Sequence, residues 1–216
     1  MRLLRIAFLL LVACGGGQIH NLPLAWRAAD DSPRPSPEVA HAFSVAPFAF
    51  GLRDVRSDPT AVGAYEDTGF IVRTTDNVAQ YCSTRMGEML AHAGARLADP
   101  PTAILETELL DYRVVEGGTF AGTVRLRAVV RRGTSEAWSR IFIGKSKRWG
   151  RTHNPENYNE ALSNALADVA AQLVRDDDFA RALVSPAPGD ETAPPAEAQP
   201  APATSSASSS AGPPGA

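Results

Sequence analysis

The 216-residue sequence has only two cysteines and four histidines, and its net charge is −3. Two cysteines are too few for a disulfide scaffold or a cysteine-rich zinc module. A slightly acidic chain has no general attraction to nucleic acid, so we do not expect a nucleic-acid partner. The histidines do not have metal-ligand spacing, and we predict no metal site and no cofactor. They are His20, His41, His92 and His153.

Catalytic signatures are also missing. The sequence contains no HExxH, no GxSxG and no cysteine–histidine pairing. Gly144–Ser146 resembles the end of a phosphate-binding loop, but Ser139 stands where that motif needs its first glycine. The acidic run Asp176–Asp178 lacks the interleaved ligands of a calcium loop. The sequence therefore predicts no nucleotide binding, no calcium site and no enzymatic activity.

Residues 1–13 are typical of a secretory signal. Arg2 and Arg5 precede an apolar run, Ile6–Ala13, that is far shorter than the roughly 20 residues a membrane-spanning helix needs. Residues 11–15 read Leu-Val-Ala-Cys-Gly, which resembles the lipobox of bacterial lipoproteins. The resemblance implies that Cys14 is acylated and becomes the new N-terminus, held on the membrane by its acyl chains. Gly15, in place of an aspartate, implies the periplasmic face of the outer membrane.

The alternative is an ordinary cleaved signal in which Cys14 is an incidental thiol. Residues 14–37 are rich in glycine and proline, and we expect the acylated cysteine to be followed by a flexible linker. Residues 185–216 contain 26 Ala, Pro, Ser or Gly among 32 positions, which predicts a disordered tail. A single domain is therefore expected over residues 38–184.

Hydrophobic periodicity predicts the elements of this domain. We expect a strand over residues 39–50, a short hairpin near 70–72, and a helix over 76–96 capped by Asp76. Three strands over 102–115, 119–132 and 136–148 precede a helix over 154–174, with further helical turns over 176–184. The order β-α-β-β-β-α predicts an α+β two-layer sandwich, with an antiparallel sheet of about four strands and two long helices on one face.

Two local predictions follow from this arrangement. A hairpin turn centred on Glu116 and Gly117 would place Glu108 opposite Arg125, and Glu106 opposite Arg127. Cys82 falls on the apolar stripe of the first helix, so we expect a buried thiol rather than a reactive one.

Basic residues concentrate in the strand region. Residues 113–151 contain ten basic side chains and two acidic ones, a local charge of +8. With the interleaved aromatic residues Trp138, Phe142 and Trp149, this pattern makes a candidate surface for an anionic glycan or lipid. Internal neutralisation by acidic residues such as Glu106, Glu108 and Asp111 is the alternative. The candidate residues are Arg125, Arg127, Arg131, Lys145, Lys147 and Arg148.

Residues 40–184 resemble the YajG family of uncharacterised outer-membrane lipoproteins. The likeness lies in Arg53-Asp54 after the first strand, His92-Ala93-Gly94 at the end of a helix, the paired strands that follow, and the helix Asn159–Leu173 with Phe179 beyond it. The resemblance implies a location and a fold, but no activity and no site residues.

These observations favour a non-enzymatic, membrane-anchored envelope lipoprotein that acts as a binding or scaffolding module. Its expected partners are the membrane, through the lipid, and an envelope protein or an anionic glycan or lipid. The alternative is an auxiliary lipoprotein subunit of an envelope lipid or solute transport system.

Overall fold

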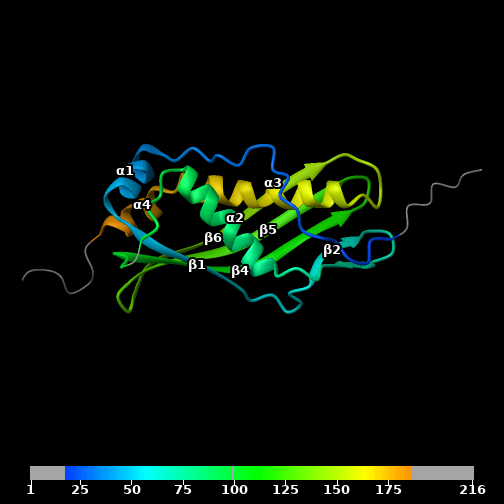
Figure 1. Ribbon diagram of the computed structural model, residues 1–216, viewed down its shortest axis with the longest axis horizontal. Helices are drawn as coiled ribbons and strands as arrows, with labels where there is room; N and C mark the ends of the chain where they lie inside the picture. The colour runs from blue at the N-terminus through cyan, green and yellow to red at the C-terminus, as the bar shows by residue number, and fades with distance from the viewer. Residues whose placement is uncertain (1–17, 99, 186–216) are drawn as a thin grey trace, which may run out of the picture. The chain divides into compact units, whose positions relative to one another are not determined.

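The computed structural model describes residues 18–98 and 100–185, so Cys14 and residues 186–216 of the predicted tail lie outside the described residues. Six strands and four helices are found in the described part of the chain (Figure 1). In chain order they are α1 (Pro37–Val45), β1 (Phe48–Asp54), β2 (Ala61–Tyr65), β3 (Ile71–Arg73), α2 (Val78–His92), β4 (Ala103–Glu116), β5 (Phe120–Arg132), β6 (Ser135–Arg148), α3 (Pro155–Leu173) and α4 (Asp177–Val184).

The predicted antiparallel meander is present, but the sheet is larger than expected and mixed. Its strand order is β3-β2-β4-β5-β6, and β1 also pairs with β4. Both β1 and β2 run parallel to β4, β1 along Ala103–Leu109 and β2 along Val114–Glu116. The prediction of a purely antiparallel sheet of about four strands is therefore wrong. Periodicity identifies a strand but not its partner or direction, and the long connection through α2 permits the parallel pairing.

The two-layer arrangement is confirmed. Helices α2 and α3 lie side by side on one face of the sheet (Figure 1). The expected cap is present on α3, where the Asn154 side chain accepts a hydrogen bond from the Glu156 N–H and Pro155 occupies the first turn. The cap of α2 is Asn77 rather than Asp76, and α2 ends at His92.

The first predicted strand is wrong over its first half. Residues 37–45 form α1, because the Ser36 hydroxyl accepts a hydrogen bond from the Val39 N–H and Pro37 starts the helix. Val39, Ala42 and Phe43 are buried at helical spacing. Strand β1 begins only at Phe48, after Pro47.

Residues 18–36, which we call the strap, are extended and packed against the domain rather than a flexible linker. Ile19 and Leu22 are buried in the core, and the Leu22 N–H donates to the Arg73 carbonyl oxygen at 2.8 Å. The backbone N–H groups of three strap residues donate at 2.9–3.0 Å to polar side chains of α3. These pairs are Ala25–Asn159, Arg27–Ser163 and Ala29–Asn164. Turn-forming composition predicts an extended chain but not the hydrogen-bond partners that hold it.

Helix α3 lies directly on the backbone of β5 and β6. A β-carbon at Gly122 would lie 2.5 Å from the Ala161 carbonyl oxygen, and Gly144 makes a similar approach to α3. Side chains of α3 also reach the outer edge of β6. Asp168 accepts a hydrogen bond from the Lys145 N–H, and Gln172 donates one to the Ile143 carbonyl oxygen, each at 3.0 Å. The helix thus covers both the face and part of the edge of this strand.

The register of β4 and β5 differs from the prediction. The turn has three residues, 117–119, because Glu116 pairs with Phe120, and a bulge lies between Leu109 and Asp111. Glu108 therefore faces Arg127, and Asp111 faces Arg125, instead of the predicted Glu108–Arg125 and Glu106–Arg127 pairs.

No helix among the described residues is both long and apolar enough to cross a bilayer.

Candidate functional site

The sheet face opposite the helices, which we call the open face, is left uncovered by the described elements (Figure 1). Alternate side chains of β4, β5 and β6 point to it, and their neighbours point to the helices. Ile104, Ile141 and Ile143 are 37%, 45% and 44% exposed. Three large apolar side chains are thus accessible at the surface of a sheet whose other side is buried.

One half of the open face is internally neutralised. Arg127 lies 3.7 Å from Glu108 and 3.8 Å from Glu136, and Arg131 donates to Glu106 at 2.8 Å. The hydrogen bond and charge of Glu106 raise the pKa of Arg131. Apart from Glu136, these side chains line a groove of about 460 Å³, together with residues that include Arg53, Thr107 and Val129. For Arg127 and Arg131 the alternative of internal neutralisation is therefore the one observed.

Arg148 does not belong to the open face. It lies on the helix side of β6 and forms an ion pair with Glu160 of α3 at 2.6 Å. Trp138 and Phe142 also face the helices, where the Trp138 ring packs 5.6 Å from that of Phe179. The prediction of one surface combining all six basic residues with these aromatic residues is therefore wrong, since alternation along β6 divides them between two faces.

Three candidate residues stay together as a basic cluster, which we define as Arg125, Lys145 and Lys147. All three point to the open face on β5 and β6, where Arg125 faces Ile143 and Lys145 faces Thr123. Within residues 18–98 and 100–185, no carboxylate lies within ion-pairing distance of these three side chains. The Lys147 ammonium lies 5.9 Å from the centre of the Trp149 ring, which is 73% exposed. Asp111, which faces Arg125 across the strands, pairs instead with Arg113 at 3.2 Å. This half of the open face therefore keeps a net positive charge.

A second polar site, which the sequence analysis missed, surrounds Glu116 at the end of β4. Glu116 is 4% exposed, and its Oε1 accepts a hydrogen bond from the His153 N–H at 2.7 Å. Its Oε2 and the Tyr158 hydroxyl are buried without a partner in hydrogen-bonding geometry. Burial, followed by the nearby Glu116 carboxylate, raises the pKa of Tyr158, which keeps the phenol protonated. In the sequence Glu116 is followed by two glycines. This pattern indicates a turn and gives no sign that the carboxylate is buried.

A pocket of about 370 Å³ lies beside Glu116, and Tyr65 and His153, whose ring centres are 4.7 Å apart, form part of its lining. His153 has a positive φ of 55°, so the loop that it belongs to is held in a strained conformation. The buried carboxylate joins this loop to the end of β4. The hydrogen bond from the His153 N–H to Glu116 thus gives this carboxylate a structural role, which is to hold the loop of His153 against the end of β4.

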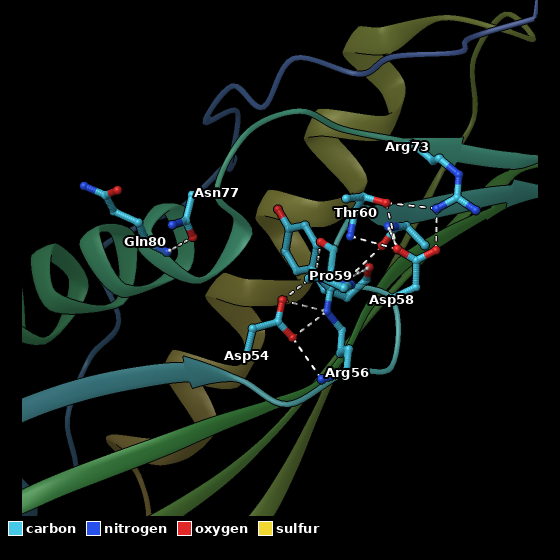
Figure 2. Close-up of polar contacts among 10 residues, drawn as sticks. Asp54, Arg56, Asp58, Pro59, Thr60, Arg73, Asn77 and Gln80 are labelled. Atoms are coloured by element: carbon cyan, nitrogen blue, oxygen red, sulfur yellow. Dashed lines mark hydrogen bonds and ion pairs between the residues drawn. The ribbon is translucent and has the colours of Figure 1, made fainter.

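Arg56 forms the most extensive polar network of the domain, shown in Figure 2. Its guanidinium donates to the Asp54 carboxylate and to the carbonyl oxygens of Ala61, Pro59 and Tyr112, at 2.7–3.3 Å. The Arg56 and Asp54 side chains are only 7% and 10% exposed. Because the protein itself satisfies these donors, the network fixes the connection between β1 and β2 rather than binding a ligand.

Cys82 is buried, as predicted. Burial raises the pKa of its thiol, which disfavours the reactive thiolate.

No family model matches this chain, and no curated protein matches it. Among solved structures, the fold is similar to that of a Xanthomonas campestris protein of family DUF330, with a TM-score of 0.53 and 15% identity over 72% of this chain and 96% of that one. A PelC protein from Paraburkholderia phytofirmans matches with a TM-score of 0.35 and 12% identity, over 72% of this chain and 95% of the other. A lipoprotein from Neisseria meningitidis matches with a TM-score of 0.28 and 13% identity, over 46% of this chain and 83% of the other.

The first of these similarities establishes a shared fold, and the other two are too weak to support an argument. The resemblance to the YajG family is not confirmed by any of the comparisons.

Proposed function

We propose that this protein is a non-enzymatic envelope lipoprotein, anchored through acylated Cys14 to the periplasmic face of the outer membrane, that binds a partner protein through its open face. The lipobox-like residues 11–15 support the anchor, and the lack of catalytic motifs in the sequence supports a non-enzymatic role.

The observation that carries the binding role is the composition of the open face. Exposed Ile141 and Ile143 lie on the same strand as Lys145 and Lys147, and Arg125 faces Ile143 from the neighbouring strand. Exposed apolar side chains beside uncompensated charge are typical of a surface that another macromolecule covers. The isoleucines favour a protein with an acidic rim over a purely ionic ligand such as a glycan.

Site-specific photocrosslinking in intact envelopes tests the binding role. A photoreactive residue at Ile143 should give a discrete crosslinked band, whereas one at the exposed Thr84 of α2 should not. Charge reversal within the basic cluster, for example Arg125→Glu with Lys145→Glu, should weaken the band, and Arg148→Glu on the other face should leave it unchanged. Equal crosslinking from Ile143 and Thr84 would argue against the open face as the binding surface.

The anchor has its own test. Palmitate should label the wild-type protein and not a Cys14→Ala variant, and only the wild type should fractionate with outer membranes. Recovery of an unlabelled wild-type protein would refute the proposed anchor.

The second candidate is an auxiliary subunit of an envelope transport system. The same uncovered, partly apolar open face favours it, because exposed apolar side chains suit docking onto a larger assembly. The identity of the crosslinked protein separates the two roles, since a transport component supports the auxiliary subunit.

A further inference from the structure

Packing of the strap shortens the reach of the N-terminal anchor. Because residues 18–36 are held on the domain, only residues 15–17 separate Cys14 from the first described residue. Four residue steps span at most about 14 Å. A free linker over residues 14–37 would instead reach roughly 80 Å. The end of the domain where the strap begins must therefore lie close to any membrane that holds Cys14.

Contacts of the first strap residues identify this end. The Ile19 N–H donates to the Tyr65 hydroxyl at 2.6 Å, and the ring of His20 lies 5.1 Å from that of Phe70. Tyr65 in turn contacts His153, which belongs to the β6–α3 loop, residues 149–154. The strap therefore starts beside the β2–β3 turn and the β6–α3 loop.

The strap ends at the opposite side of the domain. The Ser36 N–H donates to the Val174 carbonyl oxygen just beyond α3, and the described chain leaves at Ser185 after α4 (Figure 1). Helix α3, with 19 residues and a length of about 28 Å, runs between these two ends. A membrane within reach of Cys14 thus meets the end with the β6–α3 loop first.

The side chains of this loop suit a phospholipid surface. Trp149 is 73% exposed, the highest exposure among the large hydrophobic residues of the described chain. Lys147 and Arg151 flank it, and both lie at the surface. An exposed tryptophan flanked by cations is typical of the interfacial layer, where the indole lies among headgroups and the cations meet phosphates. The β2–β3 turn at the same end of the domain carries the acidic residues Glu66 and Asp67, which anionic headgroups repel. The positive charge that favours a phospholipid surface therefore lies on the β6–α3 loop.

We propose that the β6–α3 loop rests on the phospholipid headgroups of the anchoring membrane, with Trp149 in the interfacial layer and Lys147 and Arg151 at the phosphates. This inference rests on the proposed acylation of Cys14. It fixes the orientation of the domain, because β6 and α3 then lead away from the lipid and the described chain ends on the far side.

Headgroup proximity tests the orientation directly. The acylated full-length protein is placed in vesicles of phosphatidylethanolamine and phosphatidylglycerol, with a fluorophore attached through either Thr152→Cys or Ser185→Cys. Cys82 is buried and Cys14 is acylated, so each variant offers one accessible thiol. A nitroxide on the lipid headgroup should quench the label at position 152 several-fold more than the label at position 185. Equal quenching, or stronger quenching at position 185, would overturn the proposed orientation.

A longer tether separates contact from mere proximity. Ten Gly and Ser residues inserted after Gly17 should leave position 152 the more strongly quenched, because the loop itself binds the headgroups. Trp149→Ala combined with Lys147→Glu in this longer-tether protein should remove the difference. Loss of the difference on lengthening alone would refute these residues as membrane contacts.

Mass and flotation are measured first on every sample. An unmodified Cys14 or a protein that does not float with vesicles refutes the proposed anchor. A modified, floating protein without preferential quenching at position 152 refutes the orientation alone.

Discussion

The carbonyl oxygen of Ala165 in α3 occupies the space that a β-carbon on Gly144 of β6 would need. Both groups belong to the backbones of long elements, and neither can move without displacing helix or strand. We expect Gly144→Ala to destabilise the domain by about 1–3 kcal/mol, because the helix must be pushed off the sheet. Urea unfolding of the purified protein measures this change.

Gly51→Ala is the matched control for this prediction. Gly51 also lies in a strand, but an added β-carbon there would have no neighbour within 4 Å. Its effect should stay within about 0.5 kcal/mol. Similar unfolding midpoints for the two variants would contradict the close approach of α3.

The buried Arg56 guanidinium gives a second prediction. Arg56→Met should destabilise the domain by about 3–5 kcal/mol, since Asp54 would remain buried without its partner. Arg53→Met is the control, because the neighbouring Arg53 side chain is 72% exposed in its pair with Glu108. An exposed pair of this kind contributes at most about 1 kcal/mol. The thermal unfolding midpoint of Arg56→Met should therefore lie clearly below that of Arg53→Met. Equal losses of stability in the two variants would count against the network in Figure 2.

Asp58 makes the free energy of unfolding depend on pH in the acidic range. Hydrogen bonds from the Thr60 hydroxyl and from Arg73 hold the pKa of Asp58 well below its ordinary value. The carboxylate is therefore favoured in the folded state, and its contribution is complete above the ordinary pKa of about 4 and falls as the pH drops below it. Asp58→Asn should be less stable than wild type at pH 7 and should lose less stability between pH 5 and pH 3.

Urea midpoints at pH 7, 5 and 3 check this acid dependence. Thr60→Ala removes the main hydrogen-bond donor and should reduce the acid sensitivity in the same direction. Wild-type acid sensitivity in both variants would exclude Asp58 as its source.

Asn159 holds the strap through both ends of its amide, which accepts from the Ala25 N–H and donates to the Pro23 carbonyl oxygen at 3.0 Å. Asn159→Ala leaves both backbone groups unpaired, at a cost of about 1–3 kcal/mol for opening the strap. Amide exchange at Ala25 should therefore accelerate by roughly ten- to hundredfold. Gln172→Ala on the same helix does not touch the strap and should leave this exchange rate unchanged. Unaltered exchange in Asn159→Ala would show that other contacts hold the segment.

The sequence predicted much of the fold, and the errors have specific causes. Helix α3 was predictable because Asn154, Pro155 and a long apolar stripe all indicate the same element. Residues 37–45 were misread, because a short apolar run fits both a helix and a strand. The parallel pairing of β1 and the bulge near Leu109 depend on partners distant in the chain, which local patterns do not specify.

The candidate site was predictable in composition but not in geometry. The basic residues of β5 and β6 were correctly identified as a concentration of charge, yet the observed register differs from the predicted one by two residues at Glu108, and the register decides which cation meets which carboxylate. Arg127 and Arg131 meet glutamates of β4. Arg125 instead faces Asp111, and that carboxylate pairs with Arg113. The strap was missed because its contacts with Asn159 and Asn164 join segments more than 130 positions apart.

The two α3 side chains at the outer edge of β6 have a consequence for how copies of this protein behave together. A bare strand edge offers its amide and carbonyl groups to any other chain, and repeated addition of strands leads to fibrils. Asp168 and Gln172 already occupy the groups of Lys145 and Ile143 that another chain would need. The same helix that closes the core thus guards this stretch of β6 against polymerisation, even where many molecules are crowded together.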